Sequence, residues 1–145
     1  MEWKIESLQS VGPVRFGMSR AEVRSAVHAP FREVRKSVTV PTIDVFETLL
    51  LHVHYGADGG AEFVEFGGGD ATPVFGGRNL LKASFQDLRA WLRTMDPHLE
   101  EEEGAGLRSR KLGVALYAPA GDEEPERLPE GASAFAAGYY ERHGF

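Results

Sequence analysis

The stretch FGMSRAEVRSAV, residues 16–27, constrains the fold of this chain more than any other local feature. Ser19 is a favourable helix N-cap, and Glu22 follows three residues later, as in a capping box. The apolar residues after the cap recur at helical spacing, and Pro30 cannot continue a helix. We therefore predict a short helix over residues 20–27 that packs on one face only.

A second stretch, KASFQDLRAWLRTMDP, repeats that design at a constant offset along the chain. Ser84 aligns with Ser19, Asp87 aligns with Glu22, and Pro97 closes the segment. An extended apolar stretch precedes each helix, and a strand ending in tyrosine follows each, LLLHVHY and KLGVALY. We interpret the chain as a single domain, residues 1–145, built from two pseudo-repeats at about 11–69 and 74–140.

The segment LLLHVHYGADGGAEFVEF, residues 49–66, is typical of a β-hairpin. Asp58-Gly59 is a strong signal for a two-residue type I′ turn, which pairs Tyr55 with Glu62 and His54 with Phe63. One face then points to the core under the helices: Leu51, Val53, Tyr55, Val64 and Phe66. The opposite face is half polar and open: Leu50, His52, His54, Phe63 and Glu65. A slip by one residue would exchange the two faces.

Further strands are predicted at Leu107–Tyr117 and Ala132–Tyr139, and residues 34–40 alternate as in a strand. Which face of the strand KLGVALY points to the core stays open, because its apolar pattern puts Tyr117 outward whereas the duplication puts Tyr117 inward. Residues 118–132 are rich in Pro, Gly and acid and indicate a loop. The expected fold class is α+β, a mostly antiparallel sheet with two short helices on one face.

Composition excludes several functions. The net charge of −6 disfavours nucleic acid, which binds through Lys and Arg. The chain has no cysteine, which excludes disulfides, thiolate zinc sites and cysteine nucleophiles. Apolar runs such as Leu49–Leu51 are far too short for a bilayer, so we expect no membrane span, and the N-terminus lacks the apolar core of a signal peptide. These features favour a cytoplasmic protein.

His52 and His54 point the same way on a strand, and Glu65 faces His52 across the hairpin. Two histidines and a carboxylate are enough ligands for a catalytic zinc ion. The simpler interpretation is a cross-strand His–Glu pair on an exposed face, and we favour it, so that these three residues are only weak metal candidates.

Other chemistry has little support in the sequence. There is no G-x-S-x-G elbow, and the serines of the two helix starts serve as caps. Gly67–Gly69 lack the pattern of a phosphate loop and are better interpreted as a flexible hinge between the halves. We therefore expect no catalytic residue, no cofactor and no enzymatic activity.

The remaining features favour a protein partner. Acidic residues gather in Glu100–Glu103 and again in residues 122–126, where they either face solvent or attract a basic partner. Aromatic side chains on an open sheet face suit a protein interface. The candidate partner-binding residues are Leu50, His52, His54, Phe63, Glu65, Tyr117, Tyr140, Glu101 and Glu102.

The opening stretch VGPVRFGMSRAEVRSAV resembles a pattern found in small bacterial proteins, carried here by Gly12, Val14, Phe16, Gly17, Met18, Ser19, Glu22 and Val23. It is similar to the repeat unit of the β-lactamase-inhibitor-protein and outer-membrane-assembly-lipoprotein folds, and to immunity-type proteins found with bacterial toxins. The resemblance implies short helices packed on antiparallel strands and a protein-binding role. It covers about half of the chain and transfers no functional residue, because its motif encodes a capped helix.

Together these observations predict a protein-binding module, most concretely an immunity-type inhibitor of a cognate bacterial toxin. One alternative is a small metal- or ligand-binding protein centred on His52 and His54. Another is a structural subunit of a complex.

Overall fold

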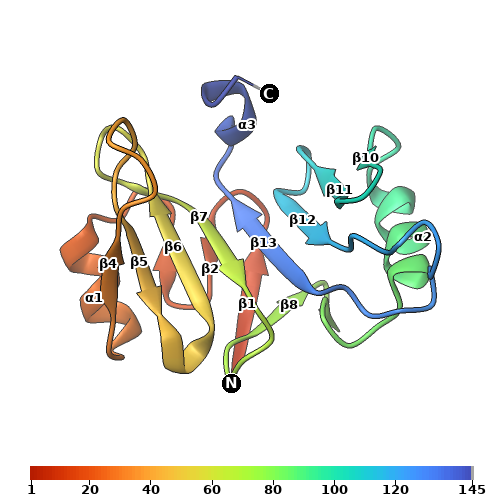
Figure 1. Cartoon of the computed structure of the whole chain (residues 1–145), viewed down its shortest axis with the longest axis horizontal. Helices are drawn as coiled ribbons and strands as arrows, with labels where there is room; N and C mark the ends of the chain where they lie inside the picture. The colour runs from red at the N-terminus through yellow and green to blue at the C-terminus, as the bar shows by residue number, and fades with distance from the viewer. Residues whose placement is uncertain (145) are drawn as a thin grey trace.

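Two four-stranded antiparallel meanders join edge to edge into one eight-stranded sheet in the computed structural model, which describes residues 1–144 (Figure 1). The strand order is β10-β11-β12-β13-β7-β6-β5-β4, so β13 and β7 meet at the centre. The first meander comprises β4 (Arg32–Val34), β5 (Ile43–Phe46), β6 (Leu51–Tyr55) and β7 (Ala61–Phe66), with a 3₁₀ turn, η1 (Glu47–Leu49), between β5 and β6. The second comprises β10 (Glu100–Glu102), β11 (Gly106–Ser109), β12 (Val114–Tyr117) and β13 (Gly131–Phe135).

A smaller sheet covers the middle of one face of the large sheet. Its order is β3-β2-β1-β8-β9, and β1 and β8 pair in parallel. These strands are β1 (Glu2–Glu6), β2 (Ser10–Val11), β3 (Val14–Arg15), β8 (Thr72–Phe75) and β9 (Arg78–Asn79). The helices α1 (Arg20–Val27) and α2 (Phe85–Met95) lie at opposite ends of the molecule (Figure 1).

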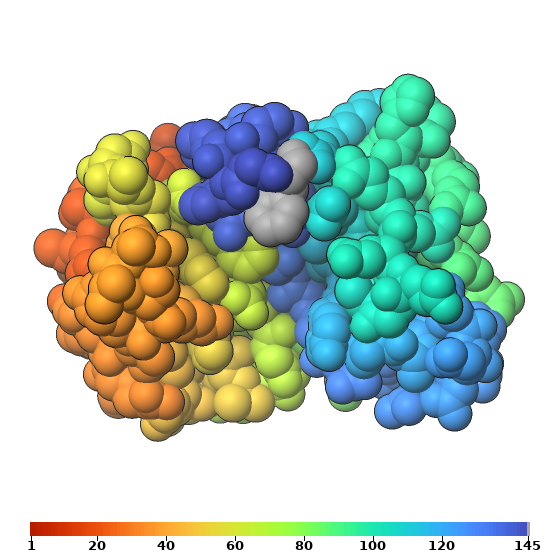
Figure 2. Space-filling view, turned by 45° about the horizontal axis from the view of Figure 1, so that its top comes forward, coloured from red at the N-terminus to blue at the C-terminus, as the bar shows by residue number. Residues whose placement is uncertain are grey.

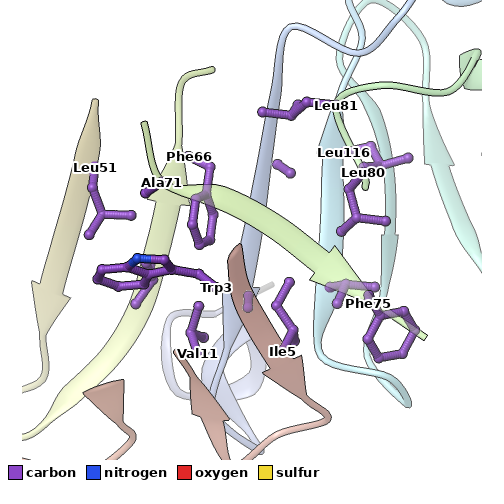
Figure 3. Packing of buried hydrophobic residues seen from close by; sticks show 14 of the residues in the cluster. Trp3, Ile5, Val11, Leu51, Phe66, Ala71, Phe75, Leu80, Leu81 and Leu116 are labelled. Atoms are coloured by element: carbon purple, nitrogen blue, oxygen red, sulfur yellow. The ribbon is translucent and has the colours of Figure 1, made fainter. Parts of the chain in front are cut away.

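The hydrophobic core lies between the two sheets (Figure 3). Trp3 of β1 is 2% exposed and meets Phe66 of β7 edge to face, with 6.1 Å between ring centroids. Leu51, Val53 and Val64 are fully buried beneath the small sheet. Each such side chain contributes about 1.5–3 kcal/mol by leaving water.

Both helix starts are confirmed. The Ser19 hydroxyl accepts a hydrogen bond from the Glu22 amide at 3.2 Å, and the Glu22 carboxylate accepts one from the Ser19 amide at 3.0 Å. Ser84 accepts from the Asp87 amide at 3.1 Å, but Asp87 makes no return bond within residues 1–144. Aspartate is one methylene shorter than the glutamate of a capping box.

Asp44 of β5 fastens α1 to the large sheet. Its carboxylate is fully buried and accepts from Arg20 at 3.1 Å, from Arg24 at 2.8 and 3.0 Å, and from the Tyr55 hydroxyl at 2.9 Å. Burial and this contact raise the pKa of Tyr55. The network joins α1, β5 and β6, and none of its members faces the opposite side of the sheet.

The hairpin register is confirmed over most of its length. His54 pairs with Phe63, and His52 pairs with Glu65. The predicted pairing of Tyr55 with Glu62 is wrong, because a bulge after His54 pairs Tyr55 with Ala61. The connection is also longer than a two-residue turn, since the Gly59 amide donates to the Gly56 carbonyl at 2.9 Å.

Two predicted strands are shorter than expected. Residues 107–117 form the two strands β11 and β12, because residues 110–113 turn between them and the Gly113 amide bonds the Ser109 carbonyl. The second strand ends at Phe135, and Tyr139 begins a one-turn helix, α3 (Tyr139–Arg142). Leu116 is 3% exposed and Tyr117 54%, so the apolar pattern gave the right parity and Tyr117 points outward.

Residues 28–48 contain the two strands β4 and β5. Val34 ends β4, whereas Val38 and Val40 lie in the exposed connection to β5. Gly67–Gly69 do link the two halves, but Gly69 passes so close to η1 that a β-carbon there would lie 2.7 Å from the Leu49 carbonyl oxygen. Close backbone passage therefore explains that glycine better than a flexible hinge does.

The α+β class with a mostly antiparallel sheet is confirmed. The expected cover of two helices is incomplete, because the strands of the small sheet occupy the centre of that face and leave the helices at its ends. Each half runs through a short hairpin, a helix and a four-stranded meander. Duplication of one ancestral unit stays a prediction.

Candidate binding groove

The face of the large sheet opposite the core carries a groove of about 680 Å³. Figure 2 shows the hollow between the two halves of the molecule, below the dark blue C-terminal segment. Residues of β7, β12 and β13 form its floor, β10 and β11 form one wall, and α3 closes one end. Within residues 1–144, no layer of the fold fills this space.

Side-chain size explains the hollow. One cross-strand row runs Glu100, Arg108, Ala115, Ser133, Glu65 and His52 from β10 to β6. Paired residues point to the same face of a sheet, so these six residues share the open face. Ala115 and Ser133 stand in the middle, and their small side chains leave a depression between longer neighbours.

The end wall is an aromatic cluster that α3 builds on the sheet. Tyr139 lies 4.7 Å from the Phe63 ring, and Tyr140 meets Phe135 edge to face at 4.9 Å. Phe135 is 2% exposed although it lies outside the main core, because α3 covers it. Burial raises the pKa of Tyr139 and of Tyr140.

Contacts with Glu62 hold α3 in place. The Glu62 carboxylate is nearly buried and lies 3.3 Å from an Arg142 nitrogen and 2.5 Å from His143 Nε2. On the other side of the helix, Arg110 reaches Glu141 at 3.2 Å. The C-terminal segment is therefore tied to both halves of the sheet.

The side wall combines carboxylates with guanidinium groups. Glu100 accepts from Arg108 at 2.8 Å and from Arg110 at 2.7 Å. Both guanidinium groups also lie over the Tyr140 ring, at 4.7 and 5.5 Å from its centroid. Burial raises the pKa of Glu100, but the two arginine hydrogen bonds outweigh burial and leave that pKa below its ordinary value.

The opposite border is formed by the histidines. His54 Nε2 lies 2.5 Å from a Glu65 carboxylate oxygen. Burial raises the pKa of Glu65, but His54 and more distant cations outweigh it, so the net pKa is lowered. Burial lowers the pKa of His52, and Lys36, His54 and Arg32 add to this against the opposite effect of Glu65.

The structure brings six of the nine candidate partner-binding residues into one groove. These are Phe63, Glu65, Tyr117, Tyr140, Glu101 and Glu102. His52 and His54 border it through Glu65, whereas Leu50 lies outside. Leu50 precedes β6, and its left-handed backbone at the end of η1 takes it off the strand face. Tyr140 follows the predicted strand Ala132–Tyr139 and belongs to α3, which presents its ring to the groove.

The open face and the acidic edge, which the sequence left as alternatives, are parts of one surface. Glu100–Glu102 form β10, which lines the wall of the groove. Glu101 turns toward α2, where it pairs with Arg89 and Arg93. The other acidic cluster lies apart in the loop before β13.

Sequence reasoning missed Arg108, Ala115, Ser133 and Glu130, which also line the groove. The alternation in GLRSRKLG indicates that Arg108 and Arg110 share a face, so the arginines carried a usable signal. Ala115 and Ser133 carried no such signal, because a small residue creates a hollow only through the longer side chains of the strands beside it.

Within residues 1–144, no three His, Cys, Asp or Glu side chains gather closely enough to hold a metal ion. His52, His54 and Glu65 accordingly do not form a ligand set, and Glu65 is engaged by His54. No helix in the described part of the chain is long and apolar enough to cross a membrane.

Searches of protein-family models, of curated proteins and of solved structures found no match to this chain. The resemblance to inhibitor and immunity proteins therefore stays an expectation.

Proposed function

We propose that this protein is a non-enzymatic binding module that holds another protein in the groove of its large sheet. The observation that carries the proposal is the uncovered sheet face, whose small central residues open a hollow of about 680 Å³ between aromatic and acidic walls. Protein interfaces are enriched in such aromatic residues and arginine.

The walls of the groove are already ordered before any partner arrives. Arg108 and Arg110 are held by Glu100, and Phe135 and Tyr139 are held by packing. A surface whose side chains are fixed loses less conformational entropy on binding. This order favours a specific protein ligand.

The most concrete form of the proposal is a cytoplasmic immunity-type inhibitor that neutralises a cognate bacterial toxin. Net charge of −6 and an acidic wall at the groove support it, because complementary charge speeds the encounter with a basic partner.

The test is a binding assay against the proteins encoded by the genes adjacent to this one, with groove-filling Ala115→Trp as the critical variant. Ala115 lies on the groove floor, so an indole there occupies the space of the partner. Ala21→Trp is the matched control, because Ala21 is exposed on α1 and outside the groove. Both variants are first checked for an unchanged unfolding transition.

We expect calorimetry to show that Ala115→Trp weakens the complex at least about tenfold, a loss of about 1.4 kcal/mol, while Ala21→Trp binds like the wild type. The proposal is wrong if no adjacent gene product binds. It is also wrong if Ala115→Trp binds as tightly as the control.

A further inference from the structure

We infer that the groove takes an arginine side chain of the partner between Glu102 and Tyr117. This inference rests on the proposed function, because it names the chemistry of the protein that the groove holds. It is based on a second cross-strand row, one step along the sheet from the row that contains Arg108.

In that second row, Glu102 pairs with Gly106, Gly106 pairs with Tyr117, and Tyr117 pairs with Gly131. The two glycines leave no side chain beside the tyrosine ring. Glu102 and Tyr117 are separated by two strand spacings, about 10 Å, which is the width of one intervening side chain. We call these four residues the glycine notch, and all of them line the groove.

The backbone itself requires the gap at Gly106. Its φ is +137°, and a β-carbon there would lie 2.0 Å from the Leu116 carbonyl oxygen. No other residue type can occupy the position without moving β12. The opening between Glu102 and Tyr117 is therefore a built feature of the sheet.

The groups at the notch are available to a ligand. Tyr117 is 54% exposed, and no ring or cation contact engages it within the described chain. The Glu102 side chain is 70% exposed, and Arg108, the cation that contacts it, stands at 4.0 Å. Glu130 also lines the groove, and its amide donates to the Tyr117 carbonyl at 2.8 Å.

The neighbouring row shows which ligand such a setting accepts. There Arg108 lies between the Glu100 carboxylate, at 2.8 Å, and the Tyr140 ring, at 4.7 Å from its centroid. The notch offers the same two groups, a glutamate and a tyrosine ring, although its tyrosine is Tyr117 of β12 and not Tyr140 of α3, and it has Gly106 where the first row has Arg108. A planar guanidinium both pairs with a carboxylate and stacks on an aromatic ring, whereas an ammonium does so less well.

Charge in the groove favours the same ligand. The residues that line the groove include five glutamates and one arginine: Glu65, Glu100, Glu101, Glu102, Glu130 and Arg108. Glu100 and Glu101 are paired with arginines of the chain. Glu65 lies beside His54, so the least compensated carboxylates of the groove are Glu102, whose nearest arginine stands at 4.0 Å, and Glu130.

The experiment is an NMR titration of the ¹⁵N-labelled full chain with three probes, the blocked tripeptides Ala-Arg-Ala, Ala-Lys-Ala and Ala-citrulline-Ala. Citrulline has the shape of arginine without its charge. We expect the arginine peptide to shift the amides of residues 102, 106, 117 and 131, the lysine peptide to bind more weakly, and the citrulline peptide to leave them unchanged. Equal binding of citrulline or lysine, or shifts confined to residues 122–126, would overturn the inference.

Matched variants separate the notch from general acidity. Glu102→Gln and Glu103→Gln change the net charge equally, but only Glu102 lines the groove. We expect Glu102→Gln to weaken the arginine peptide about threefold to tenfold and Glu103→Gln to have little effect. Tyr117→Leu should weaken binding, and Tyr117→Phe should restore it, because phenylalanine keeps the ring face. Equal effects of the two glutamine variants would refute a specific site.

The same variants separate this inference from the proposed function. If Ala115→Trp abolishes the protein complex but the arginine peptide does not bind at the notch, the proposed function stands and the arginine site is wrong. If the peptide binds the notch but Ala115→Trp leaves the complex intact, the proposed function fails. If the free protein dimerises and Glu102→Gln abolishes the dimer, the occupant is a second copy, which contradicts a foreign partner.

Discussion

Replacing Asp44 by alanine should destabilise the chain strongly. Asp44 is fully buried and accepts four hydrogen bonds, from Arg20, Arg24 and Tyr55. Removing one member of a buried ion pair costs about 3–5 kcal/mol, because the partner charges stay behind without compensation. The side chains of Arg20 and Arg24 are 27% and 24% exposed and still reach water. We therefore expect the lower end of that range, about 3 kcal/mol.

Urea unfolding followed by circular dichroism measures this free energy, and a scanning experiment should show a Tm lower by about 6–12 °C. Tyr55→Phe removes only the hydroxyl contact and should cost about 1 kcal/mol. The control is Glu47→Ala, which breaks the exposed pair with Arg32 and should cost under about 1 kcal/mol. If Asp44→Ala costs no more than Glu47→Ala, the buried network does not fasten α1 to the sheet as argued.

Three further predictions concern the groove and its surroundings. Gly106→Ala should destabilise the chain more than Gly104→Ala in urea unfolding. A β-carbon at Gly104 meets nothing within 4 Å, so that substitution costs only the strain of a left-handed backbone, about 1–2 kcal/mol. Equal losses would contradict the close passage of Gly106 at β12. Tyr139→Ala should lower the free energy of unfolding by about 1–3 kcal/mol, since Tyr139 packs on Phe63 and Phe135. Tyr117→Ala should change it by less than about 0.5 kcal/mol, because Tyr117 is exposed. An unchanged stability of Tyr139→Ala would mean that α3 is not docked. Burial should hold the pKa of the His52 ring, measured by NMR, below its ordinary value of 6.5. The unfolded chain then binds more protons, so stability falls as the pH drops from 6.5 through the folded pKa. A midpoint at or above 6.5 would contradict the conclusion that burial outweighs the opposite effect of Glu65.

Local signals in the sequence predicted local structure well. The pair Ser19 and Glu22 placed α1 at its observed residues, since a capping box satisfies the backbone of the first turn whatever lies around it. Alternation likewise gave the buried face of the hairpin, because a one-residue slip would have buried polar groups. The apolar pattern also favoured an outward Tyr117, but the duplication pointed the other way, so the sequence left that direction open.

Features that depend on distant partners escaped prediction. The parallel pairing of β1 with β8 joins residues about half the chain apart, and no local pattern indicates it. Tyr55 follows the bulge, and its hydroxyl donates to Asp44, which lies on another strand. Tyr139 was predicted as the last residue of a strand, yet the packing of Tyr139 on Phe63 and of Tyr140 on Phe135 favours a helical turn there.

The candidate site could be predicted only in part, because it too depends on the pairing of distant strands. Phe63, Glu65 and Tyr117 were found because alternation put them on an open face. The groove between them arises only where β7 pairs with β13, which brings the two halves together around Ser133. That pairing spans the two meanders, so the hollow could not be seen in either half alone.

The most direct test of the binding groove is hydrogen–deuterium exchange of the free protein and of its complex with the adjacent-gene product. The account predicts slower exchange on binding in residues 100–117 and 131–135, with little change in α1. Slower exchange confined to residues 119–128, or to the connection of residues 35–42, would contradict it and place the binding surface outside the groove.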